Sequence, residues 1–177
     1  MAKSEEKNFH FRLMALTYKL RDFLQPRMKI LNEVGIQERF HVLDYGCGPG
    51  SYIIPLAGLV GPSGKLYALD IHALAIKMVK RRVEKKHLAN VMTIQSNGPT
   101  GLPDQCLDVA LLYDVFHDLD QPGLVLKELH RVLKPNGILS FSDHHLKEND
   151  IIPGITQSGL FTPARRGPKT FSFRKTG

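Results

Sequence analysis

The sequence predicts an α/β fold in which a mostly parallel sheet lies between two layers of helices. Short apolar runs of strand length alternate with helical segments along the 177 residues, as in sheets whose strands are joined by crossover helices. The first of these runs leads directly into a glycine-rich turn and then a helix. A hydrophobic content of 42% and a charged content of 23% suit an ordinary globular chain, and we expect one domain over residues 1–177.

Turn signals separate the expected elements. Gly61-Pro62-Ser63-Gly64 ends one helix, Lys134-Pro135-Asn136-Gly137 ends another, and Arg165-Arg166-Gly167-Pro168 is the expected turn between the last two strands. We expect strands at 41–45, 65–70, 91–95, 107–113, 138–142, 159–161 and 170–174, and helices at 5–34, 52–60, 73–86, 120–133 and 148–158.

The chain is organised around the stretch from Phe40 to Gly50, FHVLDYGCGPG. A buried strand ends at Asp44 and Tyr45, three glycines follow, and Ser51 is the expected N-cap of the next helix. Glycines let a backbone approach a ligand closely, and a helix N-terminus adds free N–H groups. This arrangement is typical of an entry to a nucleotide site.

Asp70 strengthens this interpretation. It ends the second strand, roughly 20 residues beyond the turn, where a carboxylate is placed to accept hydrogen bonds from both hydroxyls of a ribose. The glycines are spaced D-x-G-x-G-x-G, starting at Asp44, whereas dinucleotide sites have G-x-G-x-x-G.

The order from Asp44 to Gly50, the acid at Asp70 and the L-K-P-N-G turn at 133–137 resemble the class I S-adenosylmethionine-dependent methyltransferases, in particular the small-molecule branch that includes quinone-biosynthesis enzymes. The resemblance runs from about residue 38 to the C-terminus. It implies a Rossmann-like three-layer α/β/α sandwich with a seven-stranded sheet and a C-terminal antiparallel hairpin. It also implies S-adenosylmethionine as the cofactor, bound by Asp44, Gly46, Cys47, Gly48, Asp70, Ile71, Asn97, Gly98 and Tyr113.

Two positions depart from motifs of related enzymes. Asn97 stands where the family usually has an acid near the adenine, although its side-chain oxygen can still accept from an amine, and Asn97-Gly98 alternatively forms only a turn. The end of the fourth strand, Tyr113-Asp114-Val115-Phe116, lacks the N/D-P-P-Y/F motif of amino methyltransferases that act on flipped bases or on glutamine. We therefore expect a small-molecule acceptor.

A methyl acceptor that carries an acidic proton needs a base, and three histidines follow neighbouring strands. His117 is the candidate; His144 and His145 are weaker ones, and a purely structural role is the alternative for all three. With Asp114, Asp118 and Asp143 they also resemble a metal-ligand set. Because His144 and His145 should point to opposite faces of an extended chain, we expect no metal.

The sequence predicts an N-terminal helical segment over residues 1–34, with the helix at 5–34 and a break at Gln25-Pro26. We expect it either to pack on the domain edge or, as the resemblance implies, to cover the cofactor as a lid. Its core residues are expected to be Leu24, Met28, Leu31 and Val34.

Composition leaves several partners open. The net charge is +7 with a pI near 9.5, and the helix at 73–86 carries a basic face, which we interpret as solvated although it would also suit nucleic acid. The two cysteines build neither a disulfide framework nor a metal site. No signal peptide or membrane span is evident, so we expect a cytoplasmic protein. We expect it to be a monomer or a homodimer.

Three functions follow from these patterns. Methyl transfer to a small molecule is preferred, methylation of RNA or another macromolecule is the second, and a cofactor-binding module without activity is the third. The short connection between residues 143 and 160, where many small-molecule enzymes carry a substrate-covering insertion, keeps the third open.

Overall fold

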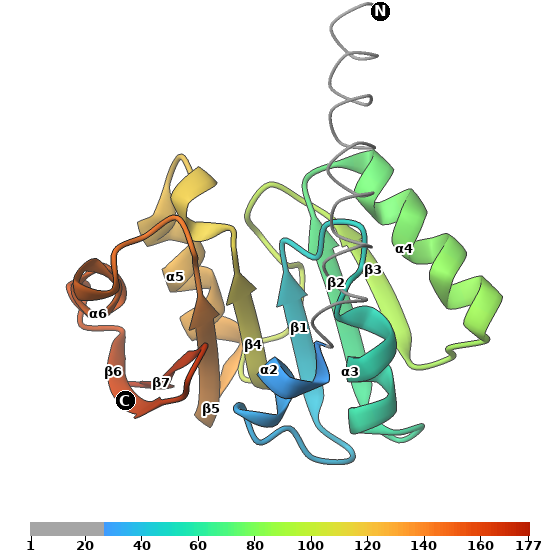
Figure 1. The fold of residues 1–177 in the computed structure, drawn as a ribbon, viewed down its shortest axis with the longest axis horizontal. Helices are drawn as coiled ribbons and strands as arrows, with labels where there is room; N and C mark the ends of the chain where they lie inside the picture. Colours follow the sequence, from blue (N-terminus) through green and yellow to red (C-terminus); the bar gives the residue numbers. More distant parts are fainter. Residues whose placement is uncertain (1–26) are drawn as a thin grey trace, which may run out of the picture.

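The computed structural model describes residues 27–177, and Figure 1 shows a twisted sheet with helices on both sides. The helix expected at 5–34 and its possible role as a lid therefore lie largely outside the described residues. Within residues 27–177, no helix has the length and the apolar content needed to cross a membrane.

The strands are β1 (His41–Tyr45), β2 (Lys65–Asp70), β3 (Val91–Gln95), β4 (Leu107–Tyr113), β5 (Leu133–Ser142), β6 (Phe161–Arg166) and β7 (Phe171–Lys175). They form one sheet with the order β3-β2-β1-β4-β5-β7-β6. Strands β1 to β5 are parallel, β7 runs antiparallel to β5, and β6 runs antiparallel to β7, which confirms the C-terminal hairpin.

Two apolar cores lie on opposite faces of the sheet, because successive strand residues point to opposite sides. The helices are α2 (Met28–Asn32), α3 (Ile53–Val60), α4 (Ala73–Lys86), α5 (Pro122–Val132) and α6 (Glu148–Thr156), with a 3-10 turn, η1, at Phe116–Asp118. Val42 belongs to the core that includes residues of α2, α3 and α4, whereas its neighbour Leu43 belongs to the core that includes residues of α5 and α6. In Figure 1, α2 and α3 lie in front of the sheet and α5 behind it. The expected Rossmann-like three-layer fold is confirmed.

Several expected boundaries were wrong. β5 begins at Leu133 instead of 138, because Leu133 pairs with Leu107 and a register shift before Val109 accommodates the following turn residues. β6 continues through Arg165 and Arg166, which we had expected in the turn, because they pair with Ser172 and Phe171 across a bulge. These two arginines extend the strand that forms the edge of the sheet.

Two local expectations near the first strand were also wrong. Met28 is 39% exposed, whereas Leu31 and Val34 are buried as expected. Ser51 does not cap α3, because that helix begins at Ile53 and has no side-chain cap hydrogen bond.

Strand order reverses between β1 and β4. From β1 the chain crosses to β2 and β3 on one side, and later to β4 and β5 on the other. The loops that leave β1 and β4 therefore diverge at the carboxyl ends of the strands, which is where open α/β sheets bind ligands. In Figure 1, this edge is at the top, where the arrows of β1 and β4 point.

Candidate active site

A cleft of about 1550 Å³ opens at this edge of the sheet. One wall is built by the residues that follow β1, β2 and β3, and the opposite wall by the residues that follow β4 and by one face of α5. All nine residues expected to bind the cofactor line this single cleft: Asp44, Gly46, Cys47, Gly48, Asp70, Ile71, Asn97, Gly98 and Tyr113.

The first two glycines of the turn differ in their roles. Gly46 has φ +77°, its N–H donates to the Leu69 carbonyl at 2.8 Å, and a Cβ at this position would lie 2.2 Å from Cγ2 of Val115. Gly48 has φ +51°, but a Cβ there would meet no atom within 4 Å. Gly46 is therefore required by close packing, whereas Gly48 leaves open space at the cleft.

Asp44 is a buried carboxylate with an unused acceptor. The residue is 2% exposed, and within residues 27–177 its Oδ2 has no hydrogen-bond partner. Burial, with a smaller effect from the charge of Asp70, raises the pKa of Asp44 from 3.8 to about 7. An unpaired buried oxygen is costly, so a cationic group that enters the cleft and donates to it would be strongly favoured.

Asp70 connects the turn to the second strand. Its Oδ2 accepts from the N–H of Gly48 and its Oδ1 from the N–H of His72, both at 2.8 Å. These bonds fix the direction of the carboxylate, and an ionised carboxylate has acceptor sites left for a ligand. Asp70 is 6% exposed and lines the cleft.

The remaining expected residues give the cleft apolar surface and amide groups. Ile71 is 57% exposed at the cleft, which is unusual for an isoleucine and makes it a free apolar surface. Tyr113 is buried and its hydroxyl is 2.7 Å from Oγ of Ser140. Cys47 is buried, and burial raises the pKa of its thiol, so the thiolate needed for nucleophilic attack is disfavoured.

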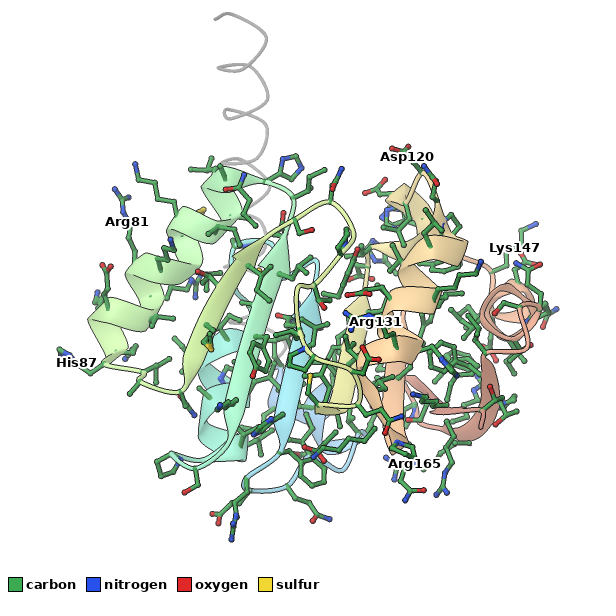
Figure 2. All side chains as sticks on the ribbon, turned by 180° about the vertical axis from the view of Figure 1, so that it is seen from behind. Arg81, His87, Asp120, Arg131, Lys147 and Arg165 are labelled. Carbon is green, nitrogen blue, oxygen red and sulfur yellow. The ribbon has the colours of Figure 1, made fainter. Side chains whose placement is uncertain are left out.

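The α5 wall carries functional candidates that no motif in the sequence marks. Leu124, Lys127, Glu128 and Arg131 recur at helical spacing and line the cleft, while the opposite face of α5 is buried in the core. Figure 2 shows Asp120 near the start of α5 and Arg131 between α5 and the strands. The spacing indicates one polar face, but only the tertiary fold turns that face toward the cleft.

The three histidines form a separate cluster. Nδ1 of His117 is 2.9 Å from both carboxylate oxygens of Asp143, and its Nε2 is 3.3 Å from Oδ2 of Asp118. None of the three histidines lines the cleft, although Asp118 and Asp114 do. His117 therefore contacts the lining of the cleft through Asp118, on the wall that follows β4.

His144 and His145 do not point to opposite faces, contrary to expectation. They follow β5 in a turn, and their ring centroids are 4.0 Å apart; His145 also lies 4.1 Å from the ring of His117. His144 pairs with Asp114 at 2.7 Å. In the part of the chain that the structure describes, no group of three or more His, Cys, Asp or Glu side chains is arranged to hold a metal ion.

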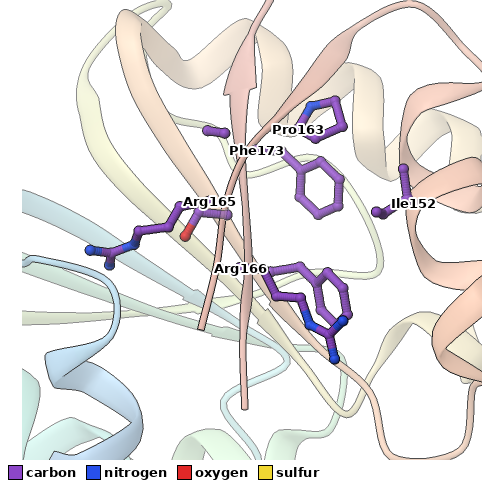
Figure 3. A pocket seen from close by; sticks show the side chains of 8 residues that line it. Ile152, Pro163, Arg165, Arg166 and Phe173 are labelled. Carbon is purple, nitrogen blue, oxygen red and sulfur yellow. The ribbon is translucent and has the colours of Figure 1, made fainter. Parts of the chain in front are cut away.

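A second, smaller hollow lies on the hairpin. It measures about 200 Å³ and lies between β6, β7 and Ile152 of α6, as Figure 3 shows. Of its two arginines, Arg166 is already paired with Glu148 and stacked 5.3 Å from the ring centre of Phe171. No residue that lines this hollow also lines the cleft, and the hollow contains none of the expected site residues.

Comparison with known proteins agrees with this geometry. The model of a family described as "Methyltransferase domain" matches residues 36–162. A demethylmenaquinone methyltransferase of Geobacillus stearothermophilus is 32% identical over 135 residues, which cover 76% of this chain and 58% of that protein. One of Lactobacillus johnsonii is 28% identical, over 71% of this chain and 52% of its own. The chain thus spans just over half the length of these relatives.

A solved structure extends the match to nearly the whole chain. The crystal structure of an S-adenosylmethionine-dependent methyltransferase from Aquifex aeolicus superposes with a TM-score of 0.75 and 27% identity, over 89% of this chain and 96% of that one. Both kinds of comparison indicate S-adenosylmethionine as the cofactor. The chain belongs to the class I S-adenosylmethionine-dependent methyltransferase family, in its quinone-biosynthesis-like branch.

Proposed function

We propose that this protein transfers a methyl group from S-adenosylmethionine to a small-molecule acceptor. The observation that carries the proposal is the convergence, in one cleft, of a buried carboxylate with an unused oxygen at Asp44, an open glycine turn and a directed carboxylate at Asp70. Asp44 and the glycine turn complement the charged amino-acid end of the cofactor, and Asp70 complements its ribose.

Each part of the cofactor has a proposed set of residues. Asp44 accepts from the ammonium group, while the turn at Gly46, Cys47 and Gly48 surrounds the methionine part. Asp70 accepts from the ribose hydroxyls. Ile71 offers its exposed side chain to a face of the adenine, and Asn97 and Gly98 approach its edge. Tyr113 closes the floor of the cleft near the sulfonium.

The cofactor supplies an already activated methyl group when bound. The protein's own task is then to orient the acceptor in line with the bond that breaks and to keep water out, which can supply much of the rate. The cleft is larger than the roughly 300–1,000 Å³ of a typical single-ligand pocket. This volume supports a second ligand beside the cofactor.

The lining of the α5 wall indicates the kind of acceptor. Leu119 and the 57% exposed Leu124 give an apolar surface, flanked by the polar Gln121 and Asp118. We therefore propose a mainly apolar acceptor with a hydroxyl or another acidic group. The relatives named as demethylmenaquinone methyltransferases support an aromatic acceptor of this sort.

His117 is the proposed proton acceptor, acting through Asp118 at the wall of the cleft. Asp143 holds Nδ1 of this imidazole, while Nε2 faces Asp118. An imidazole between two carboxylates can take up a proton that leaves the acceptor. The contribution of this pathway is testable by replacing His117 with Gln and measuring turnover at saturating cofactor.

Isothermal titration with S-adenosylmethionine and with S-adenosylhomocysteine tests the proposal. We expect both to bind with one ligand per chain and NAD not to bind. Failure of both sulfur ligands to bind, or binding of NAD in their place, would reject it. Mass spectrometry of small molecules that copurify with the protein would in addition identify a retained acceptor.

A nucleic-acid acceptor is the second candidate, because α4 presents an exposed basic face. Lys77, Lys80, Arg81, Lys85 and Lys86 are exposed, and Figure 2 shows Arg81 pointing away from the body of the protein. This candidate requires RNA binding with a steep salt dependence that is lost when Lys80, Arg81 and Lys85 are replaced by Glu. An acceptor screen that stays silent despite cofactor binding would instead support a cofactor-binding module without activity.

A further inference from the structure

The loop that follows β3 is attached to α5 through one carboxylate. Oε1 of Glu128 accepts from the backbone N–H of Thr100 at 2.8 Å and from its hydroxyl at 2.6 Å. Thr100 is only 3% exposed, and its Oγ1 accepts in turn from the N–H of Leu102 at 3.1 Å. The course of the loop around Thr100 therefore depends on where Glu128 is.

Glu128 is itself held in place by Arg131. The Nε and Nη2 atoms of Arg131 donate to the two oxygens of Glu128, both at 2.8 Å, and Nη2 also donates to the Leu102 carbonyl at 2.9 Å. Nη1 pairs with Asp104 farther along the same loop. The hydrogen bonds from Arg131, and then those from Thr100, lower the pKa of Glu128 to about 2, so the Glu128 carboxylate stays charged at physiological pH.

The other end of the loop is attached to the opposite wall of the cleft, where β1 and β2 end. The N–H of Ser96 donates to the Asp70 carbonyl at 3.1 Å, and the hydroxyl of Tyr45 donates to the Gly98 carbonyl at 3.3 Å. Asn97 and Gly98 thus lie between two anchors, one at β2 and one at α5. Because α5 is packed into the core by Val125, Leu126, Leu129 and Val132, the second anchor is rigid.

We propose that Glu128, supported by Arg131, is a positioning residue that makes the loop 97–99 selective for adenine. The inference rests on the proposed function, which assigns this loop to the adenine edge. Adenine and hypoxanthine have the same shape, but they exchange donor and acceptor at position 6 and at the adjacent ring nitrogen. The backbone groups of a fixed loop each point in one direction and can distinguish the two bases, whereas a loose loop can rearrange to bind either.

The test compares two ligands that differ only in the base. Isothermal titration measures the affinity for S-adenosylhomocysteine and for S-inosylhomocysteine in the wild type, in Glu128→Ala and in Thr100→Val. We expect Glu128→Ala to weaken the adenosyl ligand about tenfold and the inosyl ligand less than about twofold. Thr100→Val keeps the shape of the side chain but removes both hydrogen bonds of the hydroxyl, the one to Glu128 and the one from Leu102, while the N–H of residue 100 still donates to Glu128. The preference for the adenosyl over the inosyl ligand should therefore fall in the same direction by a smaller factor.

The matched control is Glu148→Ala. Glu148 also pairs with an arginine, Arg166, but on α6 and away from the cleft; both affinities should be unchanged. An equal loss for the two ligands in Glu128→Ala and Thr100→Val, or no loss for either, would overturn the inference. If the wild type binds neither ligand, the proposed function itself fails, and that result is distinct from a selective or an equal loss.

Discussion

The two walls of the cleft differ in how they are built. The wall after β1 and β2 is built mainly from backbone, and hydrogen bonds join its glycine turn to Leu69 and Asp70 at the end of β2. The wall at α5 consists of side chains on one face of a helix, and a carboxylate–guanidinium pair connects it to a loop from elsewhere in the chain. The first wall makes a fixed cofactor site, whereas the second can change its side chains to suit an acceptor without altering the fold.

The largest expected effect lies in the backbone wall. Gly46→Ala would place a Cβ 2.2 Å from Val115 at a left-handed φ, so we expect about 2–4 kcal/mol of lost unfolding free energy and no cofactor binding. Gly48→Ala has the φ strain without the clash and should cost only about 1 kcal/mol. Urea unfolding of both variants measures the difference; equal losses would contradict the separate roles of these glycines.

Asp44 should oppose stability while supporting binding. Its folded pKa of about 7 lies above the unfolded value of 3.8, so the folded state binds the proton more tightly, and stability falls as pH rises from about 4 to 7. The free energy of unfolding of Asp44→Asn should therefore exceed that of the wild type above pH 7, by up to about 4 kcal/mol. Below pH 4 the variant and the wild type should be equally stable. Denaturant titrations at pH 4 and pH 8 check this.

The same carboxyl should make cofactor affinity depend on pH. Because the cationic ammonium needs the ionised form of Asp44, affinity for S-adenosylmethionine should fall up to about tenfold for each pH unit below 7. 5′-Methylthioadenosine has no amino-acid end and is the control, with an affinity that should change little. A parallel pH dependence for the two ligands would show that another group titrates.

The smallest expected effect is at the hydroxyl that touches the loop after β3. Tyr45→Phe removes one long hydrogen bond, 3.3 Å to the Gly98 carbonyl, so we expect less than about 1 kcal/mol of lost affinity for S-adenosylhomocysteine. Burial raises the pKa of Tyr45 to about 12, so this bond should persist across the range of titration experiments. Isothermal titration at pH 7 and pH 9 gives both quantities.

The difference between the two walls of the cleft also explains which site residues could be predicted from the sequence. The stretch from Asp44 to Gly50 and the acid at Asp70 are local signals, because backbone geometry dictates the glycines and strand ends place the acids. Glu128 and Arg131 carry no such signal, since their role arises from contacts with Thr100 and Leu102, nearly 30 residues earlier. The early start of β5 and the extension of β6 were missed for the same reason: strand pairing overrode the turn signals of Lys134-Pro135-Asn136-Gly137 and Arg165-Arg166.

The most direct test is a crystal structure of the protein with S-adenosylhomocysteine. We predict that the ribose hydroxyls lie within hydrogen-bond distance of the Asp70 carboxylate and that the amino group lies at Oδ2 of Asp44, which at present has no partner among residues 27–177. A ligand bound elsewhere, or in the same cleft with its ribose turned away from Asp70, would contradict the account.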